Sequence, residues 1–439
     1  MRWLTVATII AAIGSFAVLF LSAWTLGTRM NLEFTAYWGL FFALTGVLGG
    51  LMQETTRAVG SERAAVAAIP TTAPLAEEFL DGPADASGDA DAPHTGARPI
   101  VIAAGVAACT FAIFVLTGPL WMHLIVADHV GWAVVLLAAG LSSYAMQAAV
   151  SGLLAGAGLW GHYAALIVID ILVRVVPAAL AFVFGWGLVA FLLITVVGAA
   201  SWVPLVLASP AARRAVRGRA DVPARRFVVL MVTAMGASGA SALLVTGFPT
   251  LVKLADDYGA SGAGPLSEHT VPVAAVTAAG IAYAVSLTRA PLLMPLEKFQ
   301  NAIIVHFVQS TSQPFASLLR PLGLLVGFGV FGACVAWPVG PWILQILPGD
   351  YMIPGVGLFA LTIGATTTAV LMVTGSVMLA TNHHRAYLVG WIAATAIAAA
   401  LLFAPGALLW RTAAALIIGP LASAVSHLVI LRRDTTAVA

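Results

Sequence analysis

Four ionisable side chains lie inside or at the ends of long apolar runs, where charge is costly. Asp170 and Arg174 are four positions apart in DILVR, so a helix would place them on one face, where they can neutralise each other. Arg57 and Arg289 each stand in the triplet TRA, at the ends of two other apolar runs. A guanidinium offers a planar fork of donors that suits carboxylates and phosphates. The residue types therefore predict an ion pair between Asp170 and Arg174, and anion binding at Arg57 and Arg289.

The apolar runs that must position these side chains are long enough to cross a membrane. Of the 439 residues, 61% are hydrophobic and 9% are charged, and the mean hydropathy is +1.01. An apolar helix of about 20 residues crosses the ~30 Å hydrocarbon layer. Because backbone groups in lipid must be satisfied internally, we expect an all-α polytopic membrane protein. The twelve predicted spans are 4–27, 34–53, 99–122, 131–155, 162–185, 187–209, 227–250, 271–294, 316–338, 353–380, 386–404 and 408–431.

The loop after the sixth predicted span is strongly basic. Its sequence SPAARRAVRGRADVPARR, residues 209–226, holds six arginines. Short cytoplasmic loops carry the excess of Lys and Arg, so this loop is predicted to be cytoplasmic, and twelve spans then place both termini in the cytoplasm. We interpret the loop as a solvated run of charge. The net charge of +2 gives no reason to expect nucleic acid as a partner.

The two halves of the chain are related by an internal repeat. Residues 98–129 and 320–351 share an Arg-Pro start, a Gly-Pro and an Asp at one constant offset, which pairs Arg98 with Arg320 and Asp128 with Asp350. The two TRA triplets pair one span earlier. Because six spans return the chain to its starting side, we expect two six-helix lobes of equal orientation, related by a pseudo-twofold axis along the membrane normal, with a cleft between them.

The repeat sets the domain boundaries. The predicted N-terminal lobe covers residues 1–209 and includes a cytoplasmic linker over 60–97, which is acidic and too polar to bury a core, so we expect it to be disordered. The basic inter-lobe loop covers 210–226, the C-terminal lobe 227–431, and a cytoplasmic tail 432–439.

Each charged position has a structural as well as a functional interpretation. Asp170 with Arg174 could be an ion pair that lets a structural helix insert, or a cavity pair that breaks when substrate or a coupling ion arrives. Arginines near span ends can also snorkel to the interface as positive-inside anchors, an interpretation that fits Arg98 and Arg320.

For Arg57 and Arg289 the repeat favours a site. Symmetry places these mates opposite one another at the inner mouth of the cleft, where two guanidiniums could bind a phosphate or diphosphate bidentately. Glu54 near Arg57 and Arg320 at the next repeat boundary would be accessory residues.

Several kinds of chemistry are missing from the sequence. The two lysines, in LVKLA and LEKFQ, do not follow a glycine-rich turn, so no ATP-binding loop is expected. No cysteine, histidine or carboxylate spacing indicates a metal site or another cofactor. The longest predicted outer loop, KLADDYGASGAGPLSEHT, is short for the acid, base or metal groups of a membrane glycosyltransferase or polymerase. We therefore do not expect an enzyme.

Three segments resemble a known family. The ending GLMQETTRAV of the second span, the ending VSLTRAPL of the eighth and the corner GPWILQILPGDY after the ninth resemble Wzx-type polysaccharide flippases. These belong to the multidrug/oligosaccharidyl-lipid/polysaccharide (MOP) exporter superfamily, with the multidrug and toxin extrusion (MATE) antiporters and the lipid II flippase. One departure is that the first span carries no charge between Arg2 and Arg29, where the lipid II branch is expected to place cavity arginines.

The resemblance implies a function and a location. It implies two V-shaped lobes in a bacterial plasma membrane that move a sugar linked to polyprenyl phosphate or diphosphate from the inner to the outer leaflet by alternating access, for cell-surface polysaccharide biosynthesis. Membrane lipids and other polysaccharide biosynthesis proteins would be partners. High Arg and Ala with very low Lys is typical of a high-GC bacterium such as an actinomycete.

Two other functions stay open at this point. A MATE-like antiporter of amphipathic drugs would share the fold, although cationic drugs favour cavity carboxylates and Asp170 already has Arg174 beside it. A non-transporting scaffold of a glycan assembly complex would bind partners through the basic loop or the acidic linker.

Overall fold

The computed structural model describes residues 2–67, 96–262, 276–309, 314–347, 350–381 and 383–438, and all regular structure in these ranges is helical. The first half comprises α1 (Arg2–Ala67), α2 (Pro99–Trp121), η1 (Met122–Leu124), α3 (Val130–Gly156), α4 (Trp160–Phe184), α5 (Leu188–Val197), η2 (Gly198–Ala200), α6 (Trp202–Ala208) and α7 (Pro210–Val216). The second half comprises α8 (Ala224–Val245), α9 (Phe248–Gly262), α10 (Ala278–Gln309), α11 (Pro314–Gln345), α12 (Gly355–Ala380), α13 (His384–Leu402) and α14 (Leu408–Val438).

These helices account for the predicted spans. Ten helical stretches of the described residues are long and apolar enough to cross a membrane. The first of them, Trp3–Glu62, holds two predicted spans, and the shorter apolar helix Ala278–Leu293 corresponds to the eighth. The predicted fold class, an all-α polytopic membrane protein, is confirmed.

A glycine divides α1 into its two spans. Gly27 has φ 68° and ψ 172°, which is not helical, and a backbone with positive φ strongly favours glycine because it lacks Cβ. The chain reverses there, so the first span runs to one end of the bundle and the second runs back. Gly27 therefore takes the place of a longer loop between the two spans.

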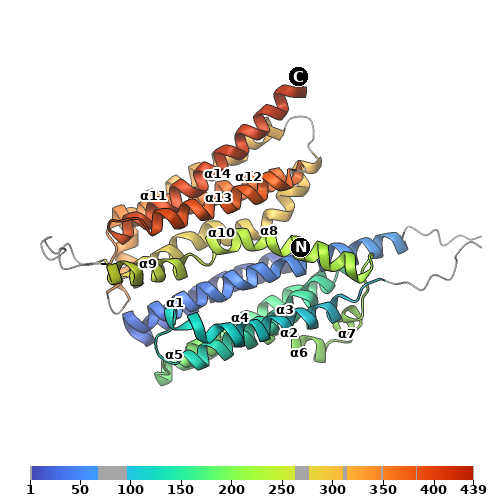
Figure 1. Ribbon diagram of the computed structural model, residues 1–439, viewed down its shortest axis with the longest axis horizontal. Coiled ribbons are helices and arrows are strands. Elements are labelled where there is room, and N and C mark those ends of the chain that lie inside the picture. Colours follow the sequence, from blue (N-terminus) through green and yellow to red (C-terminus); the bar gives the residue numbers. More distant parts are fainter. Residues whose placement is uncertain are drawn as a thin grey trace, which may run out of the picture.

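Figure 1 shows two lobes lying side by side along the long axis. Helices α1 to α6 form the N-terminal lobe, in which α3 and α4 pack on α1 and α2 packs on α3. In the C-terminal lobe α12 packs against α10, α11 and α14, and α13 packs against α14. Helices α8 and α9 run along α1 and join the lobes.

The two ends of the bundle differ in character. One end carries α7, with Arg213 and Arg214, and the C-terminal end of α14, and we call it the basic end. Helix α9 lies at the opposite end, and its Lys253 lies near Glu33, which lines the same cavity as Gly27. Figure 1 shows the helices of the two lobes diverging toward the basic end.

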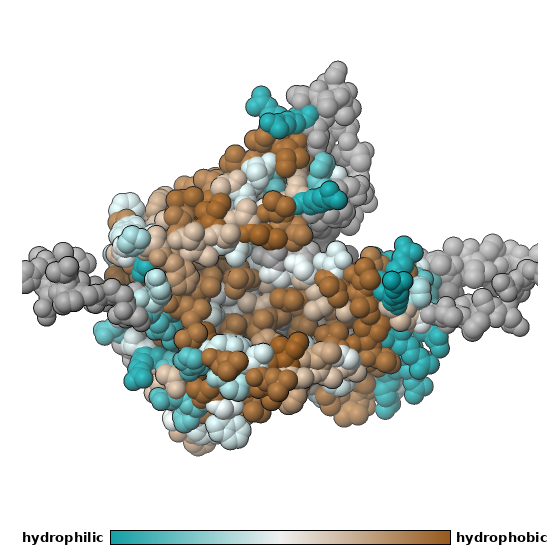
Figure 2. All heavy atoms as spheres, viewed as in Figure 1, coloured by the Kyte–Doolittle hydropathy of each residue, from teal (hydrophilic) through white to brown (hydrophobic). Residues whose placement is uncertain are grey.

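The sides of the bundle are apolar where they face outward. Leu116 is 76% exposed, Leu324 69% and Phe331 65%, and Figure 2 shows hydrophobic residues covering much of the visible side. Apolar surface of this extent is unusual for a soluble protein and fits contact with lipid. The chain is a multi-pass membrane protein.

Small residues bring the two lobes into close contact along α1 and α8. A methyl group at Gly50 would overlap the backbone nitrogen of Met235, and one at Gly46 would overlap the side chain of Ala242. Backbone atoms cannot move aside as a flexible side chain can. The pair α1 and α8 is thus packed as closely as glycine allows.

Gly50→Ala should lower stability, whereas its neighbour offers a matched control. Overpacking costs typically about 1 to 3 kcal/mol, while an alanine in place of an unobstructed helical glycine gains up to about 1 kcal/mol. A Cβ at Gly49 would meet nothing within 4 Å. Thermal unfolding in detergent should therefore show a lower Tm for Gly50→Ala and an unchanged or higher one for Gly49→Ala. Equal Tm values for the two variants would contradict the close packing.

The loops near the basic end contain more structure than the sequence indicates. Helix α1 continues to Ala67, into the segment predicted as a disordered linker, and Ala97 at its other end exchanges backbone hydrogen bonds with Ala220 and Val222. Residues 68–95, which hold the acidic part of the linker, lie outside the described residues. The basic loop contains α7, whose N-cap Ser209 accepts a hydrogen bond from the Ala212 amide.

Candidate functional site

Arg57 lies near the basic end and is held by two carboxylates. Its Nη2 is 2.6 Å from Glu54 Oε1, one turn earlier on α1, and its Nη1 is 3.2 Å from Asp221 Oδ2. The Arg57 side chain is 44% exposed, whereas that of Glu54 is 7% exposed. Arg57 is therefore an accessible guanidinium whose charge is balanced by residues of its own chain.

Its repeat mate Arg289 has a different environment. Arg289, on α10, is 4% exposed. Its Nη2 lies 3.5 Å from Thr368 Oγ1 on α12, and its guanidinium carbon lies 5.7 Å from the centre of the Phe248 ring at the start of α9. The C-terminal lobe thus buries this arginine among three of its helices.

The expectation that the two arginines face one another across an inner mouth is wrong for this structure. Asp221, which binds Arg57, precedes α8, and Phe248, which packs on Arg289, follows it. At 1.5 Å per residue, α8 separates the two levels by roughly 30 Å. The repeat makes the two positions equivalent in sequence, but the tertiary contacts of each arginine place Arg57 near the basic end and Arg289 far deeper in the bundle.

Asp170 and Arg174 form the predicted ion pair on α4. Arg174 Nη2 is 2.9 Å from Asp170 Oδ1. The side chain of Arg174 is 3% exposed and that of Asp170 is 23% exposed. The guanidinium of Arg174 also lies 4.9 Å from the ring centre of Phe42, 5.8 Å from that of Trp38 and 5.9 Å from that of Phe41. Cation–π contacts of this kind are worth about 0.5 to 2 kcal/mol each.

A glycine lets this pair fit inside the lobe. A methyl group at Gly198, in the 3-10 segment η2, would overlap the Arg174 guanidinium. The break between α5 and α6 thus lies directly against the ion pair. Contacts from α1 and η2 surround the pair on α4, which favours the structural interpretation of Asp170 and Arg174 over a cavity pair that breaks when substrate or a coupling ion arrives.

The other predicted positions are simpler. Arg98 and Arg320 are exposed, as positive-inside anchors would be. Glu54, predicted as an accessory residue, is the nearest partner of Arg57. Arg320 lies near the start of α11, and its accessory role stays a prediction.

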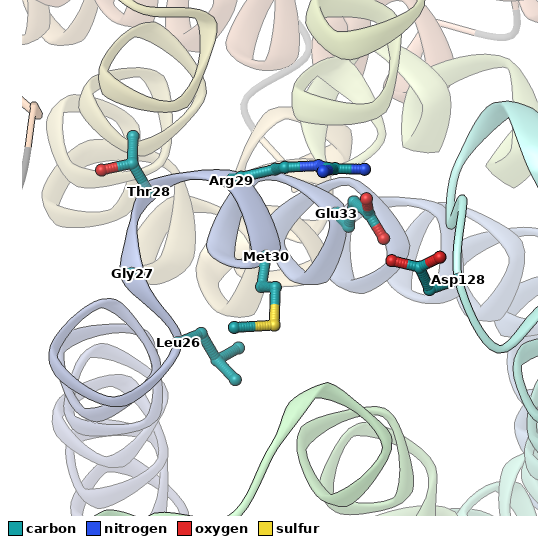
Figure 3. Close-up of a pocket in the computed structure, with 7 residues that line it drawn as sticks. All are labelled: Leu26, Gly27, Thr28, Arg29, Met30, Glu33 and Asp128. Carbon is teal, nitrogen blue, oxygen red and sulfur yellow. The ribbon is translucent and has the colours of Figure 1, made fainter.

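A buried carboxylate at the opposite end was not predicted from the sequence. Glu33, on α1, is 5% exposed and accepts a hydrogen bond from the Ala127 amide at 3.2 Å. It lines a cavity of about 410 Å³ together with Leu26, Gly27, Thr28, Arg29, Met30 and Asp128. Figure 3 shows the carboxylates of Glu33 and Asp128 pointing toward one another, with Arg29 alongside. The sequence feature that could have indicated this site is an acidic residue four positions after Arg29, at the start of a span.

Helix α9 brings more charge to the same end. The segment predicted as the longest outer loop is helical from Lys253 to Gly262, and Lys253 Nζ is 2.7 Å from Asp257 Oδ2. Burial, followed by the charge of Asp257, raises the pKa of Asp256, with Lys253 opposing that rise. Within the described residues no group of three or more His, Cys, Asp or Glu side chains could hold a metal ion.

The lobes touch at the opposite end. The Asp350 amide donates to Thr28 Oγ1 at 3.3 Å, and Thr250 Oγ1 donates to the Ala36 carbonyl at 2.6 Å. Asp350 and its repeat mate Asp128 therefore both lie beside the Gly27 turn, as the repeat predicts. The lobes are thus joined by hydrogen bonds at this end, whereas their helices diverge toward the basic end (Figure 1).

The fold is similar to that of solved MOP superfamily transporters. A MATE crystal structure in complex with MaD3S superposes with a TM-score of 0.68 at 13% identity, covering 99% of this chain and 95% of that one. An inward-facing multidrug resistance MATE transporter of the MOP superfamily gives 0.68 at 12% identity over 98% and 94%. A MOP superfamily transporter from Pyrococcus furiosus, described by the reverse polarity of its binding pocket, gives 0.65 at 14% identity over 99% and 95%.

Sequence comparison identifies the family. No protein-family model matches the chain. Uncharacterized protein Mb3654 of Mycobacterium bovis is 36% identical over 429 residues, which are 97% of this chain and 90% of that protein. Uncharacterized protein Rv1510 of Mycobacterium tuberculosis is 34% identical over 429 residues, with the same coverage. The chain belongs to the family of these mycobacterial proteins, whose source agrees with the composition of a high-GC actinomycete.

Proposed function

We propose that this protein is an exporter of lipid-linked glycans, which moves a sugar or oligosaccharide on polyprenyl phosphate or diphosphate from the inner to the outer leaflet of a bacterial plasma membrane. The product would serve cell-surface polysaccharide biosynthesis. The positive-inside rule assigns the basic end to the cytoplasm, which puts both termini there. Lobes that diverge toward the basic end would then open to the cytoplasm, where such substrates are made.

The observation that carries this proposal is the position of Arg57. It presents a guanidinium that is 44% exposed at the end where the lobes diverge, and a phosphate can bind such a fork bidentately. Arg289 lies roughly 30 Å deeper by the length of α8. Arg57 would thus meet the headgroup first, and Arg289 would bind it later, once the C-terminal lobe has rearranged. The two arginines act in sequence.

Export of an anionic substrate can be driven without ATP. Carrying an anion outward across an inside-negative membrane releases about 2.3 kcal/mol per charge per 100 mV. Asp170, the deepest carboxylate predicted for ion coupling, is already neutralised by Arg174 at 2.9 Å. We therefore propose export driven by the membrane potential and by substrate concentration, without ATP.

A MATE-like drug antiporter is the alternative with the same fold. The buried Glu33 is a carboxylate that a cationic drug or a proton could use, although it lies at the end where the lobes are in contact. The structural neighbour from Pyrococcus furiosus is described as having a binding pocket of reverse polarity and, for that reason, a different function. Among the described residues, the buried guanidinium of Arg289 favours anionic cargo here. A non-transporting scaffold that binds other polysaccharide biosynthesis proteins would bind no cargo of either kind.

Ligand-dependent thermal unfolding of the purified protein separates these functions. A ligand that binds only the folded state raises the Tm with its concentration over Kd. Polyprenyl diphosphate should raise the Tm, while polyprenol with the same tail and a lipophilic quaternary ammonium dye should raise it less. Stabilisation by the dye but not by the diphosphate would favour the antiporter, and equal effects of polyprenol and polyprenyl diphosphate would refute recognition of the phosphate.

A further inference from the structure

The guanidinium of Arg57 already holds two internal anions. Glu54 accepts from Nε at 2.9 Å and from Nη2 at 2.6 Å, and Asp221 accepts from Nη1 at 3.2 Å and from Nη2 at 3.4 Å. These are the two edges of the fork by which an arginine binds phosphate oxygens. An incoming headgroup must therefore displace one of the two carboxylates.

The two carboxylates are not equally easy to displace. Glu54 is on the same helix as Arg57, its side chain is 7% exposed, and its bonds are the shorter ones. Asp221 is in the connection between α7 and α8, its side chain is 25% exposed, and its bonds are the longer ones. Displacement of Asp221 leaves Arg57 with one carboxylate and one edge open to solvent.

Asp221 belongs to the segment that joins the lobes. Its amide donates to the Ala58 carbonyl at 3.2 Å, and on either side the Ala220 amide donates to the Ala97 carbonyl at 2.8 Å and the Val222 carbonyl accepts from the Ala97 amide at 2.9 Å. These bonds and the Arg57 contact fix residues 220–222 to the N-terminal lobe. Helix α8 begins two residues later, at Ala224.

We infer that Asp221 is an internal competitor for the anion site at Arg57, and that a phosphate or diphosphate headgroup bound there releases the inter-lobe segment from α1. This inference rests on the proposed function and adds its regulation. Binding of an anion at Arg57 would therefore change the attachment of the chain segment that leads from the first lobe into α8. Without an anion, Asp221 holds both the site and the connection in place.

Calorimetric titration with inorganic diphosphate tests the competition. Asp221→Asn keeps the shape of the side chain and removes its charge, so it should bind diphosphate about tenfold more tightly than the native protein, given the strength of a charge-assisted hydrogen bond. Arg57→Ala should lose most of the binding. Glu62→Gln, further along α1, removes the same charge without touching Arg57 and should bind like the native protein.

Hydrogen exchange of residues 217–223 in the native protein tests the release, and does not depend on a variant folding. Diphosphate should speed exchange of the Ala220 and Asp221 amides. Diphosphate binding that leaves this exchange unchanged, or equal affinity in Asp221→Asn and Glu62→Gln, would overturn the inference while the proposed function stands. If neither the native protein nor Asp221→Asn binds diphosphate, the inference is wrong, and leaflet transfer of the lipid-linked sugar decides the proposed function separately.

Discussion

Vesicles with the Arg289→Ala variant are expected to transfer lipid-linked sugar between leaflets about 10 to 100 times more slowly than vesicles with the native protein, since hydrogen bonds to a charged group contribute about 1.5 to 3 kcal/mol. Arg289 is 4% exposed and lies deep in the bundle, where a headgroup in transit has lost its water. In such a place a fixed guanidinium is worth more than at the surface. The measurement is the initial rate of leaflet transfer at equal protein content.

Two controls separate substrate binding by Arg289 from packing. Arg385→Ala removes an exposed arginine from the same lobe and should transfer at the native rate. Thr368→Val removes the hydroxyl that lies 3.5 Å from Arg289 and keeps the shape, so it tests the contribution of that contact. A native transfer rate in Arg289→Ala, or an equal loss in Arg385→Ala, would contradict a specific role for Arg289.

Arg174→Leu is expected to be the most destabilising single change. It leaves Asp170 without its 2.9 Å partner and removes the cation from three aromatic rings. Breaking a buried pair by removing one partner costs about 3 to 5 kcal/mol. Because Asp170 keeps 23% side-chain exposure, the lower end of that range applies. Thermal unfolding in detergent should show a clear fall in Tm.

The double variant Asp170→Leu with Arg174→Leu decides between the two interpretations of the pair. Apolar residues in place of a whole buried pair are often neutral or stabilising, so the Tm should recover. Transfer at the native rate would make the pair structural. A stable double variant without transfer would instead show that the pair takes part in coupling, contrary to the structural interpretation.

The helices were predictable because hydropathy is a local property. Every predicted span corresponds to a helical stretch of the described residues, and the repeat mates Asp128 and Asp350 lie at the same end of the bundle. The environments of Arg57 and Arg289 were not predictable, because each depends on distant residues. Asp221 is 164 residues from Arg57, and Thr368 is 79 residues from Arg289. Nothing local indicates which of two equivalent arginines becomes buried.

Glu33 illustrates a second limit. A carboxylate at the start of a span is expected to lie in the interface, and the spacing from Arg29 predicts a surface ion pair at most. Its burial comes from packing against the segment that ends at Asp128, where it accepts a hydrogen bond from the Ala127 amide at 3.2 Å. Only the reversal at Gly27 and the corner after α2 bring these segments together. The position of Glu33 in a cavity therefore depends on the turns that bring distant segments together, and hydropathy of the helices does not indicate it.

Export of an anionic lipid-linked glycan with the help of Arg57 and Arg289 is best tested by leaflet accessibility of a labelled polyprenyl-diphosphate-linked sugar in vesicles of purified protein. We expect transfer by the native protein and little or none by the Arg57→Ala, Arg289→Ala double variant at equal protein content. No transfer by the native protein, or equal transfer by the double variant, would show that the proposed export, or the role of the two arginines in it, is wrong.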